Sequence, residues 1–196
     1  MIDGDNLEIN KLGCIRNSQI LFSDISFQLN ENEILQIQGE NGCGKSSLLQ
    51  CIAGLSTPAA GEIKNIPEFH YVGHTNGIKS SLTVIENLKL CCHLLSVSFD
   101  IEKIPQALKL DVLQNTFAKN LSAGQKRKVA IAKLFLIPKK LWLLDEPLTS
   151  LDSETQTFFL SALEKHLLQG GMAIITTHQS IILDNVKIKT LRLTSC

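Results

Sequence analysis

The chain has 196 residues, of which 44% are hydrophobic and 19% charged, and its 19 basic and 19 acidic side chains give a formal net charge of zero. These values are typical of one globular domain and exclude a disordered chain. The balanced charge argues against a broad basic surface, so no nucleic-acid partner is expected. No run of about 18 apolar residues occurs, which argues against a membrane-spanning helix.

The first ten residues, MIDGDNLEIN, are acidic and lack the charged and apolar regions of a signal peptide. The six cysteines form no CxxC pair and no metal-ligand spacing, so we expect reduced thiols. The expected location is the cytosol or the cytosolic side of a membrane.

The first part of the chain predicts strands, because short apolar runs alternate with Asn, Gly and Ser. The predicted strands lie at 6–10, 20–29 and 33–38, with two more inside 61–73 around Pro67. A helix is expected from about residue 45 to 53, where Gly54 ends it.

From residue 81 to 121 the apolar spacing becomes helical. Later elements are predicted as a helix after LSAGQ (121–125), a strand LWLLD (141–145), a helix at 154–168 and a strand MAIITTH (172–178). The alternation of strand and helix in the last third predicts a parallel α/β sheet.

The stretch GENGCGKSS, residues 39–47, fits the pattern GxxxxGK[ST] between a predicted strand and a predicted helix. Its glycines let backbone N–H groups approach phosphate oxygens. Lys45 would supply a positive charge for the β- and γ-phosphates, and the Ser46 hydroxyl would ligate Mg²⁺. The alternative is a glycine-rich turn. The candidate nucleotide-binding residues are Gly39, Glu40, Asn41, Gly42, Cys43, Gly44, Lys45, Ser46 and Ser47.

Two carboxylates, Asp145 and Glu146, follow the apolar run LWLL. Such a run predicts a buried parallel strand that ends at the edge of the sheet where α/β proteins bind ligands. We expect Asp145 to hold Mg²⁺ through water and Glu146 to act as general base on an attacking water. His178 closes the next apolar strand and should emerge at the same edge. The alternatives are a helix-capping turn for the acidic pair and a structural role for the histidine.

The stretch LSAGQ precedes a strong helical pattern, and helix amino termini bind anions. Ser122, Gly124 and Gln125 are the candidates to face a phosphate. The alternative is an ordinary helix start with Ser122 as its N-cap. The basic run KRK at 126–128 is expected to be a solvated helix face.

Together and in this order, GENGCGKSS, LSAGQ, LWLLDEP, SLD (150–152) and His178 resemble the motifs of the nucleotide-binding subunits of ATP-binding-cassette (ABC) transporters. The resemblance covers essentially the whole chain. It implies an α/β fold of the P-loop NTPase class and ABC type, in which a parallel-sheet ATPase core carries an antiparallel β subdomain and a helical signature subdomain. The signature of the family corresponds to LSAGQ (121–125) in this chain. The implied parts of this single domain, 1–196, are a β subdomain with the phosphate-binding loop (about 1–75), a helical subdomain ending in the signature (76–124) and the rest of the core (125–196).

The resemblance implies ATP and Mg²⁺ as cofactors and a head-to-tail homodimer as the working unit. In this family the signature of one subunit reaches the γ-phosphate of ATP held by the other subunit. Residues 150–152 would cross the seam of that dimer, and His178 would hold the γ-phosphate. Lys45, Glu146 and His178 are therefore the expected catalytic residues. Ala123 replaces a common glycine of the signature, a change of one methyl group that should leave the phosphate contacts possible.

The chain departs from the family pattern at two places. No aromatic residue lies between residues 10 and 20, where the family places one that stacks on adenine, so Arg16 or an apolar contact would replace it. His74 stands where the family has a glutamine that meets Mg²⁺ and signals to the membrane subunit. We therefore expect His74 near the metal; the alternative is a loop residue without a role.

These departures, with VGHTNGIK before LTVIENL and TTHQ near the end, resemble the ATP-binding subunits of cytochrome c maturation systems. The resemblance implies docking on integral membrane subunits of the haem-handling complex, at the cytoplasmic face of the bacterial inner membrane. ATP hydrolysis would drive haem export or release of a haem chaperone. The alternatives are an ABC ATPase for another cargo, such as lipid or peptide, and a soluble ABC ATPase that acts on ribosomes or DNA.

Overall fold

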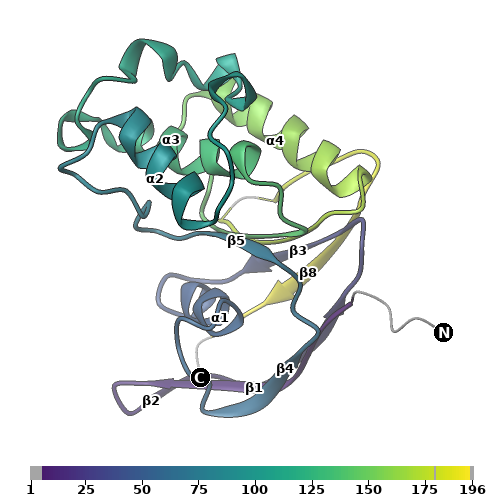
Figure 1. Ribbon diagram of the computed structural model, residues 1–196. Helices are drawn as coiled ribbons and strands as arrows, with labels where there is room; N and C mark the ends of the chain where they lie inside the picture. Colours follow the sequence, from purple (N-terminus) through teal and green to yellow (C-terminus); the bar gives the residue numbers. More distant parts are fainter. Residues whose placement is uncertain (1–5, 179, 195–196) are drawn as a thin grey trace.

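The computed structural model describes residues 6–178 and 180–194. Residues 1–5, which begin the acidic amino-terminal stretch, and Cys196 lie outside this range, as does residue 179. Two sheets and a group of helices make up the described chain (Figure 1).

The smaller sheet is antiparallel and has the strand order β2-β1-β4. Its strands are β1 (Leu7–Arg16), β2 (Gln19–Leu29) and β4 (Ala60–Lys64). The larger sheet has the order β5-β6-β7-β3-β8, and each neighbouring pair is parallel. Its strands are β3 (Glu33–Gln38), β5 (Phe69–Val72), β6 (Leu141–Asp145), β7 (Met172–Thr176) and β8 (Lys187–Arg192).

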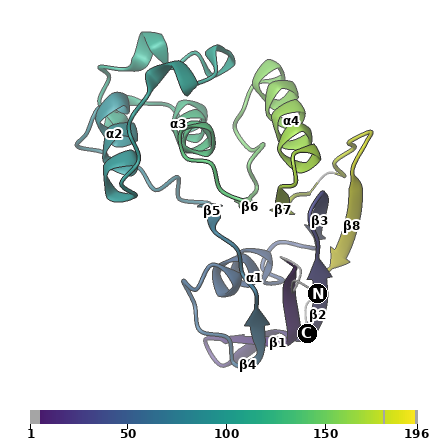
Figure 2. The same ribbon diagram turned by 45° about the vertical axis from the view of Figure 1, so that its right-hand side comes forward.

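The helices divide between the two faces of the parallel sheet (Figure 2). They are α1 (Lys45–Ile52), α2 (Val84–Leu94), α3 (Ala123–Leu136) and α4 (Ser153–Leu168). Helix α1 lies between the two sheets, whereas α2, α3 and α4 lie on the opposite side of the parallel sheet.

Strand β6 shows why the apolar run LWLL is continuous rather than alternating. Leu141 and Leu143 belong to the core between the sheets, and Trp142 and Leu144 belong to the core under α3 and α4. Side chains of a strand alternate between faces, so a strand covered on both faces must be apolar throughout. This burial fixes Asp145 at the end of β6, where it stays in the interior.

The antiparallel and parallel sheets agree with the predicted fold class, and the structure corrects three details of the predicted elements. The helical pattern at 81–121 forms one α-helix, α2, followed by four short 3₁₀ turns: Ile101–Lys103, Gln106–Leu108, Asp111–Leu113 and Ala118–Asn120. Pro105 and the left-handed Lys109 (φ 52°) prevent a continuous helix there.

Strand β8 is the second correction, because its sequence KIKTLR alternates charged and apolar residues and was not predicted as a strand. It is an edge strand paired in parallel only with β3 among the described strands, and edge strands carry charged side chains more readily than central ones. The third is β1, which extends to Arg16 beyond the predicted 6–10. Cross-strand pairing with β2 continues through several register shifts, and this pairing is not visible in the local sequence.

Candidate functional site

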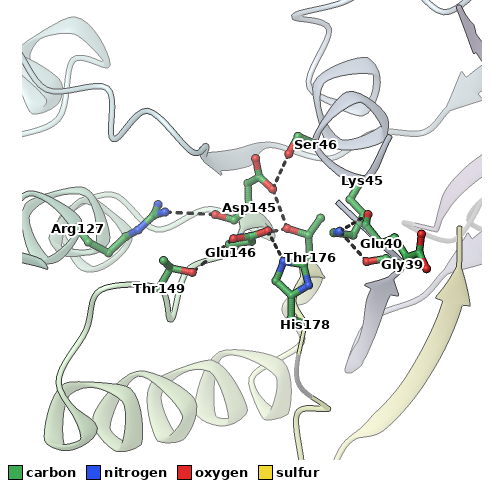
Figure 3. A network of polar contacts seen from close by, with 10 residues as sticks. All are labelled: Gly39, Glu40, Lys45, Ser46, Arg127, Asp145, Glu146, Thr149, Thr176 and His178. Atoms are coloured by element: carbon green, nitrogen blue, oxygen red, sulfur yellow. Dashed lines mark hydrogen bonds and ion pairs between the residues drawn. The ribbon is translucent and has the colours of Figure 1, made fainter. Parts of the chain in front are cut away.

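Three loops meet at the carboxyl edge of the parallel sheet (Figure 3). They follow β3, β6 and β7, which are neighbours in the order β6-β7-β3. Thr176 is the register partner of both Ile37 and Asp145, so the three strands end at the same level. The sheet therefore brings together the glycine-rich loop, the Asp145–Glu146 pair and His178.

The glycine-rich loop, residues 39–44, has a backbone that demands glycine. Gly42 and Gly44 have φ angles of 87° and 102°, in the left-handed region that side chains disfavour. A Cβ on Gly44 would also come within 3.1 Å of Leu21 and 3.0 Å of Phe22. Gly44 is the N-cap of α1 and has no side chain to cap it, and N–H groups at an uncapped helix start can receive an anion.

Lys45 is the first residue of α1 and is almost completely buried. Its Nζ donates hydrogen bonds of 2.8 Å and 2.9 Å to the carbonyl oxygens of Gly39 and Glu40. The loop thus curls around the ammonium group, which places a fixed positive charge where the loop would receive phosphate.

Asp145 receives two hydroxyl donors on one carboxylate oxygen. Ser46 Oγ lies 3.0 Å from Oδ1, and Thr176 Oγ1 lies 2.7 Å from the same atom. The other oxygen, Oδ2, is buried and has no hydrogen-bond partner among the described residues. A carboxylate with one unused buried oxygen, beside a hydroxyl group, offers the oxygen ligands that a hard cation such as Mg²⁺ prefers.

Glu146 and His178 face each other at the end of the neighbouring strands. His178 Nε2 lies 3.0 Å from Glu146 Oε1, and the two side chains are 49% and 25% exposed respectively. They line a cleft of about 290 Å³ together with residues 147–150, Gln156 and Thr177. Glu146 directly follows the buried strand β6 and has a left-handed backbone (φ 47°).

The structure assigns Arg127 to this site, although the sequence analysis placed KRK on a solvated helix face. That expectation is wrong for Arg127, which is buried in α3. Its guanidinium donates to the carbonyl oxygens of Gly73 (2.9 Å) and Asp145 (3.4 Å). Burial lowers the pKa of Arg127, while the nearby charges of Asp145 and Glu146 raise it. Nothing in the local pattern separates Arg127 from its neighbours, because only the tertiary fold brings β5 and β6 beneath this helix.

The signature residues form a capped helix start with Ser122 as the N-cap, which was the alternative to a phosphate-facing role. Ser122 Oγ accepts from Gln125 N (3.2 Å), and Gln125 Oε1 accepts from Ser122 N (2.8 Å), which makes a capping box at the start of α3. A Cβ on Gly124 would come within 2.3 Å of the Ser150 carbonyl oxygen, so this glycine is required for close backbone approach. Lys128 of the same helix forms an ion pair of 2.7 Å with Asp152.

Residues 122–125 of the signature are exposed or half-buried, whereas Leu121 is buried. Ser122 and Gln125 bond to each other and make no hydrogen bond with residues 39–47 in the described part of the chain. The single chain therefore does not bring the signature and the glycine-rich loop together.

His74 is exposed in the loop after β5. Within the described ranges it has no hydrogen bond or ion pair to Ser46 or Asp145, and no three His, Cys, Asp or Glu residues there are grouped so that they could hold a metal. The loop itself is held at both ends by α3: Arg127 bonds to Gly73, and Lys133 Nζ donates to the Gly77 carbonyl (2.8 Å). A role of His74 at the metal stays a prediction.

A second cleft, of about 590 Å³, opens between the β1–β2 hairpin and the glycine-rich loop. It is lined by residues 18–21 and 41–43, none of which is aromatic. Ile15 and Ile20 are register partners near the hairpin tip and are 55% and 53% exposed. The hairpin thus presents aliphatic rather than aromatic surface beside the loop.

A phosphate-binding loop with its lysine, a buried aspartate and a half-buried glutamate at one sheet edge define the class of P-loop nucleotide-binding proteins. A family model described as "ABC transporter" matches residues 22–149. The cytochrome c biogenesis ATP-binding export protein CcmA of Nitrosospira multiformis is 40% identical, and the match covers 96% of this chain and 98% of that protein. Its counterpart of the same name from Vibrio cholerae is 39% identical, with 95% and 98% covered.

Solved structures of ABC ATP-binding proteins have a similar fold. An ATP-binding subunit of an ABC transporter is 26% identical, with a TM-score of 0.77 over 88% of this chain and 79% of that chain. The ATP-binding cassette MJ0796, described as dimeric and bound to ADP and Pi, is 22% identical with a TM-score of 0.76, covers 88% of both chains and is similar in fold.

The chain belongs to the ABC transporter family and, within it, to the group of cytochrome c biogenesis ATP-binding export proteins. It is an ABC ATPase, whose cassette binds and hydrolyses ATP. Within the described residues, no helix is both long enough and apolar enough to cross a membrane.

Proposed function

We propose that this chain is the ATP-hydrolysing subunit of a membrane complex for cytochrome c biogenesis, where hydrolysis drives haem export or release of a haem chaperone. The support is the near-complete coverage of relatives that carry this name. Its partners would be integral membrane subunits of the haem-handling complex, and its place the cytoplasmic face of the bacterial inner membrane.

The triphosphate of ATP would bind the loop at residues 39–47. The N–H groups at the start of α1 and the buried ammonium of Lys45 supply the positive potential that phosphate needs. The adenine ring would lie in the cleft beside Ile20 and Leu21, where aliphatic contact replaces aromatic stacking. Discrimination among purine bases should then be weak.

Ser46 and Asp145 would hold Mg²⁺, with the unpartnered Oδ2 of Asp145 accepting from the water shell of the ion. The chemistry that Mg²⁺ supplies when bound is neutralisation of charge on the phosphate oxygens. The hydroxyl of Ser46 can offer its oxygen to a cation while its proton continues to bond Asp145.

Glu146 would be the general base, and this assignment rests on one observation: its carboxylate is partly exposed in a cleft, 3.0 Å from His178 and next in sequence to Asp145. The carboxylate accepts a proton from the attacking water. His178, whose Nε2 contacts the carboxylate, would orient it and hold the γ-phosphate.

A homodimer would complete the site. The exposed start of α3, with Ser122, Gly124 and Gln125, is free to meet the ATP of a second chain. The proposed division of the chain, with a β subdomain at about 1–75, a helical subdomain at 76–124 and the rest of the core at 125–196, places the signature at the boundary of the last two parts.

Glu146→Gln tests the assignment of the base. The amide cannot accept the proton, so ATP hydrolysis should fall by roughly 100- to 10,000-fold while ATP binding is retained. Lys45→Ala should instead lose ATP affinity. Lys165→Met, which removes an exposed charge on α4, is the matched control and should hydrolyse ATP as the wild type does. A Glu146→Gln protein within a few-fold of wild-type turnover would move the base to another residue.

The cytochrome c assignment needs a cellular test. A strain that lacks this gene should lose covalently attached haem from its c-type cytochromes, and the wild-type gene, but not Glu146→Gln, should restore it. Normal cytochrome c in the deletion strain would assign the chain to another cargo.

A further inference from the structure

Thr176 is the last residue of β7 and is completely buried. The four preceding residues of this strand are apolar and buried, so a hydroxyl group at this position needs hydrogen-bond partners. Its two partners are neighbouring residues of the site, Asp145 and Glu146.

The hydroxyl of Thr176 uses both its donor and its acceptor capacity. It donates to Asp145 Oδ1 at 2.7 Å and accepts from the backbone N–H of Glu146 at 2.9 Å (Figure 3). Because Ser46 donates to the same Oδ1, that oxygen has two donors while Oδ2 has no partner in the described chain. The hydroxyl thereby fixes which carboxylate oxygen remains for a ligand.

The same hydroxyl supports the strained backbone of Glu146. A non-glycine residue with φ 47° is uncommon and must be held by its surroundings. The N–H of Glu146 is shared between the carbonyl oxygen of Thr176 (3.2 Å) and its hydroxyl oxygen (2.9 Å). Thr176 thus fixes the point from which the Glu146 side chain enters the cleft.

We propose that Thr176 is a positioning residue that aligns the metal-facing carboxylate of Asp145 with the proposed base, Glu146, through one shared hydroxyl. The proposal rests on the proposed function of this site. Valine has the same shape and would fill the same space, so shape alone does not explain threonine here. Only the hydroxyl can join the two residues.

The test compares Thr176→Val, which removes the hydroxyl, with Thr176→Ser, which keeps it. Both are made in a Glu146→Gln background so that ATP is not consumed, and Thr190→Val, on the exposed edge strand β8, is the control. ATP binding is titrated by calorimetry with EDTA and with increasing Mg²⁺. Thermal unfolding without nucleotide reports folding.

Thr176→Val should weaken the Mg²⁺-dependent part of ATP binding by about 10-fold or more, as loss of a partner of a metal-holding carboxylate does. Binding in EDTA should change less than about two-fold, since the phosphate-binding loop is untouched. Thr176→Ser should restore Mg²⁺ dependence. If Thr176→Val does not fold, Thr176→Cys, whose thiol is a weaker donor, takes its place and should fall between valine and serine.

Equal Mg²⁺ dependence of the valine and threonine proteins would overturn the proposal, as would an equal loss in the serine and valine proteins. Failure of the proposed function looks different, because the parent Glu146→Gln protein would then show no Mg²⁺-dependent ATP binding at all.

Discussion

Arg127 donates a hydrogen bond of 2.9 Å from its buried guanidinium to the carbonyl oxygen of Gly73, at the end of β5. The same group reaches the carbonyl oxygen of Asp145 at the end of β6. Gly73 precedes His74, and Asp145 precedes Glu146. One side chain of α3 therefore holds the points at which both loops begin. The helix that begins with the signature is therefore tied to the end of β6 and to the loop of His74.

Replacing Arg127 by methionine should leave two carbonyl oxygens without their donor, which lowers the free energy of unfolding by about 1–3 kcal/mol for each oxygen. Removal of a buried charge offsets part of this loss. We expect a lower unfolding midpoint and a fall of about 10-fold in kcat, with KM for ATP within about three-fold, because the guanidinium bonds to Gly73 and Asp145 and not, among the described contacts, to the phosphate-binding loop. Arg127→Lys can reach one carbonyl and should be intermediate. Steady-state kinetics and thermal melts measure this, and a lysine variant as poor as methionine would contradict the two-carbonyl explanation.

Dimerisation should depend on the start of α3. Glu146→Gln with ATP and Mg²⁺ should elute as a dimer from a sizing column and as a monomer without nucleotide. Adding Ala123→Asp should abolish the dimer, because a carboxylate there repels the triphosphate of the partner although it suits the first turn of its own helix. The exposed Thr157→Asp is the matched control and should still dimerise. If Ala123→Asp dimerises equally, the signature does not face the nucleotide.

His74 should link hydrolysis to the membrane partners rather than to ATP binding. The glutamine amide, like the imidazole, can contact a metal or its water, so His74→Gln should keep ATPase activity. His74→Ala should bind ATP normally yet lose coupling to cytochrome c maturation. The assay is ATPase activity and cytochrome c formation in the assembled complex; full maturation by His74→Ala would show that His74 has no role in coupling.

Two histidines, His70 in β5 and His166 in α4, should make the stability of the fold depend on pH. Burial lowers the pKa of His70 and of His166, although hydrogen bonds to backbone carbonyl oxygens partly oppose it, and the His166 ring stacks on Trp142 with centroids 4.0 Å apart. The unfolded chain then binds more protons than the folded chain as pH falls below about 6.5, so stability should be lost toward acid. Thermal melts between about pH 7.5 and about pH 5 test this. His166→Gln should flatten the dependence, and the exposed His93→Gln should not.

The parts of the site whose chemistry depends on neighbouring residues can be predicted from the amino-acid sequence. GENGCGKSS needs its glycines for left-handed backbone and its lysine for charge, and LWLLDE needs apolar residues on both faces of one strand before the acids. Both requirements concern consecutive residues, so the local sequence shows them. The prediction that His178 emerges near the acids follows from parallel strand order, which alternating elements imply.

Contacts between segments that are far apart in the chain could not be predicted, because they depend on how the helices and strands pack. Arg127 lies in a basic run that looks solvated, yet the packing of α3 on β5 and β6 buries it against two carbonyl groups. Thr176 is one of two adjacent threonines, and register with Asp145 gives its hydroxyl two partners. Strand β8 forms because its backbone pairs with β3 at the edge of the sheet. Local sequence reports backbone preference and side-chain chemistry, whereas these three features depend on which segment the fold places next to them.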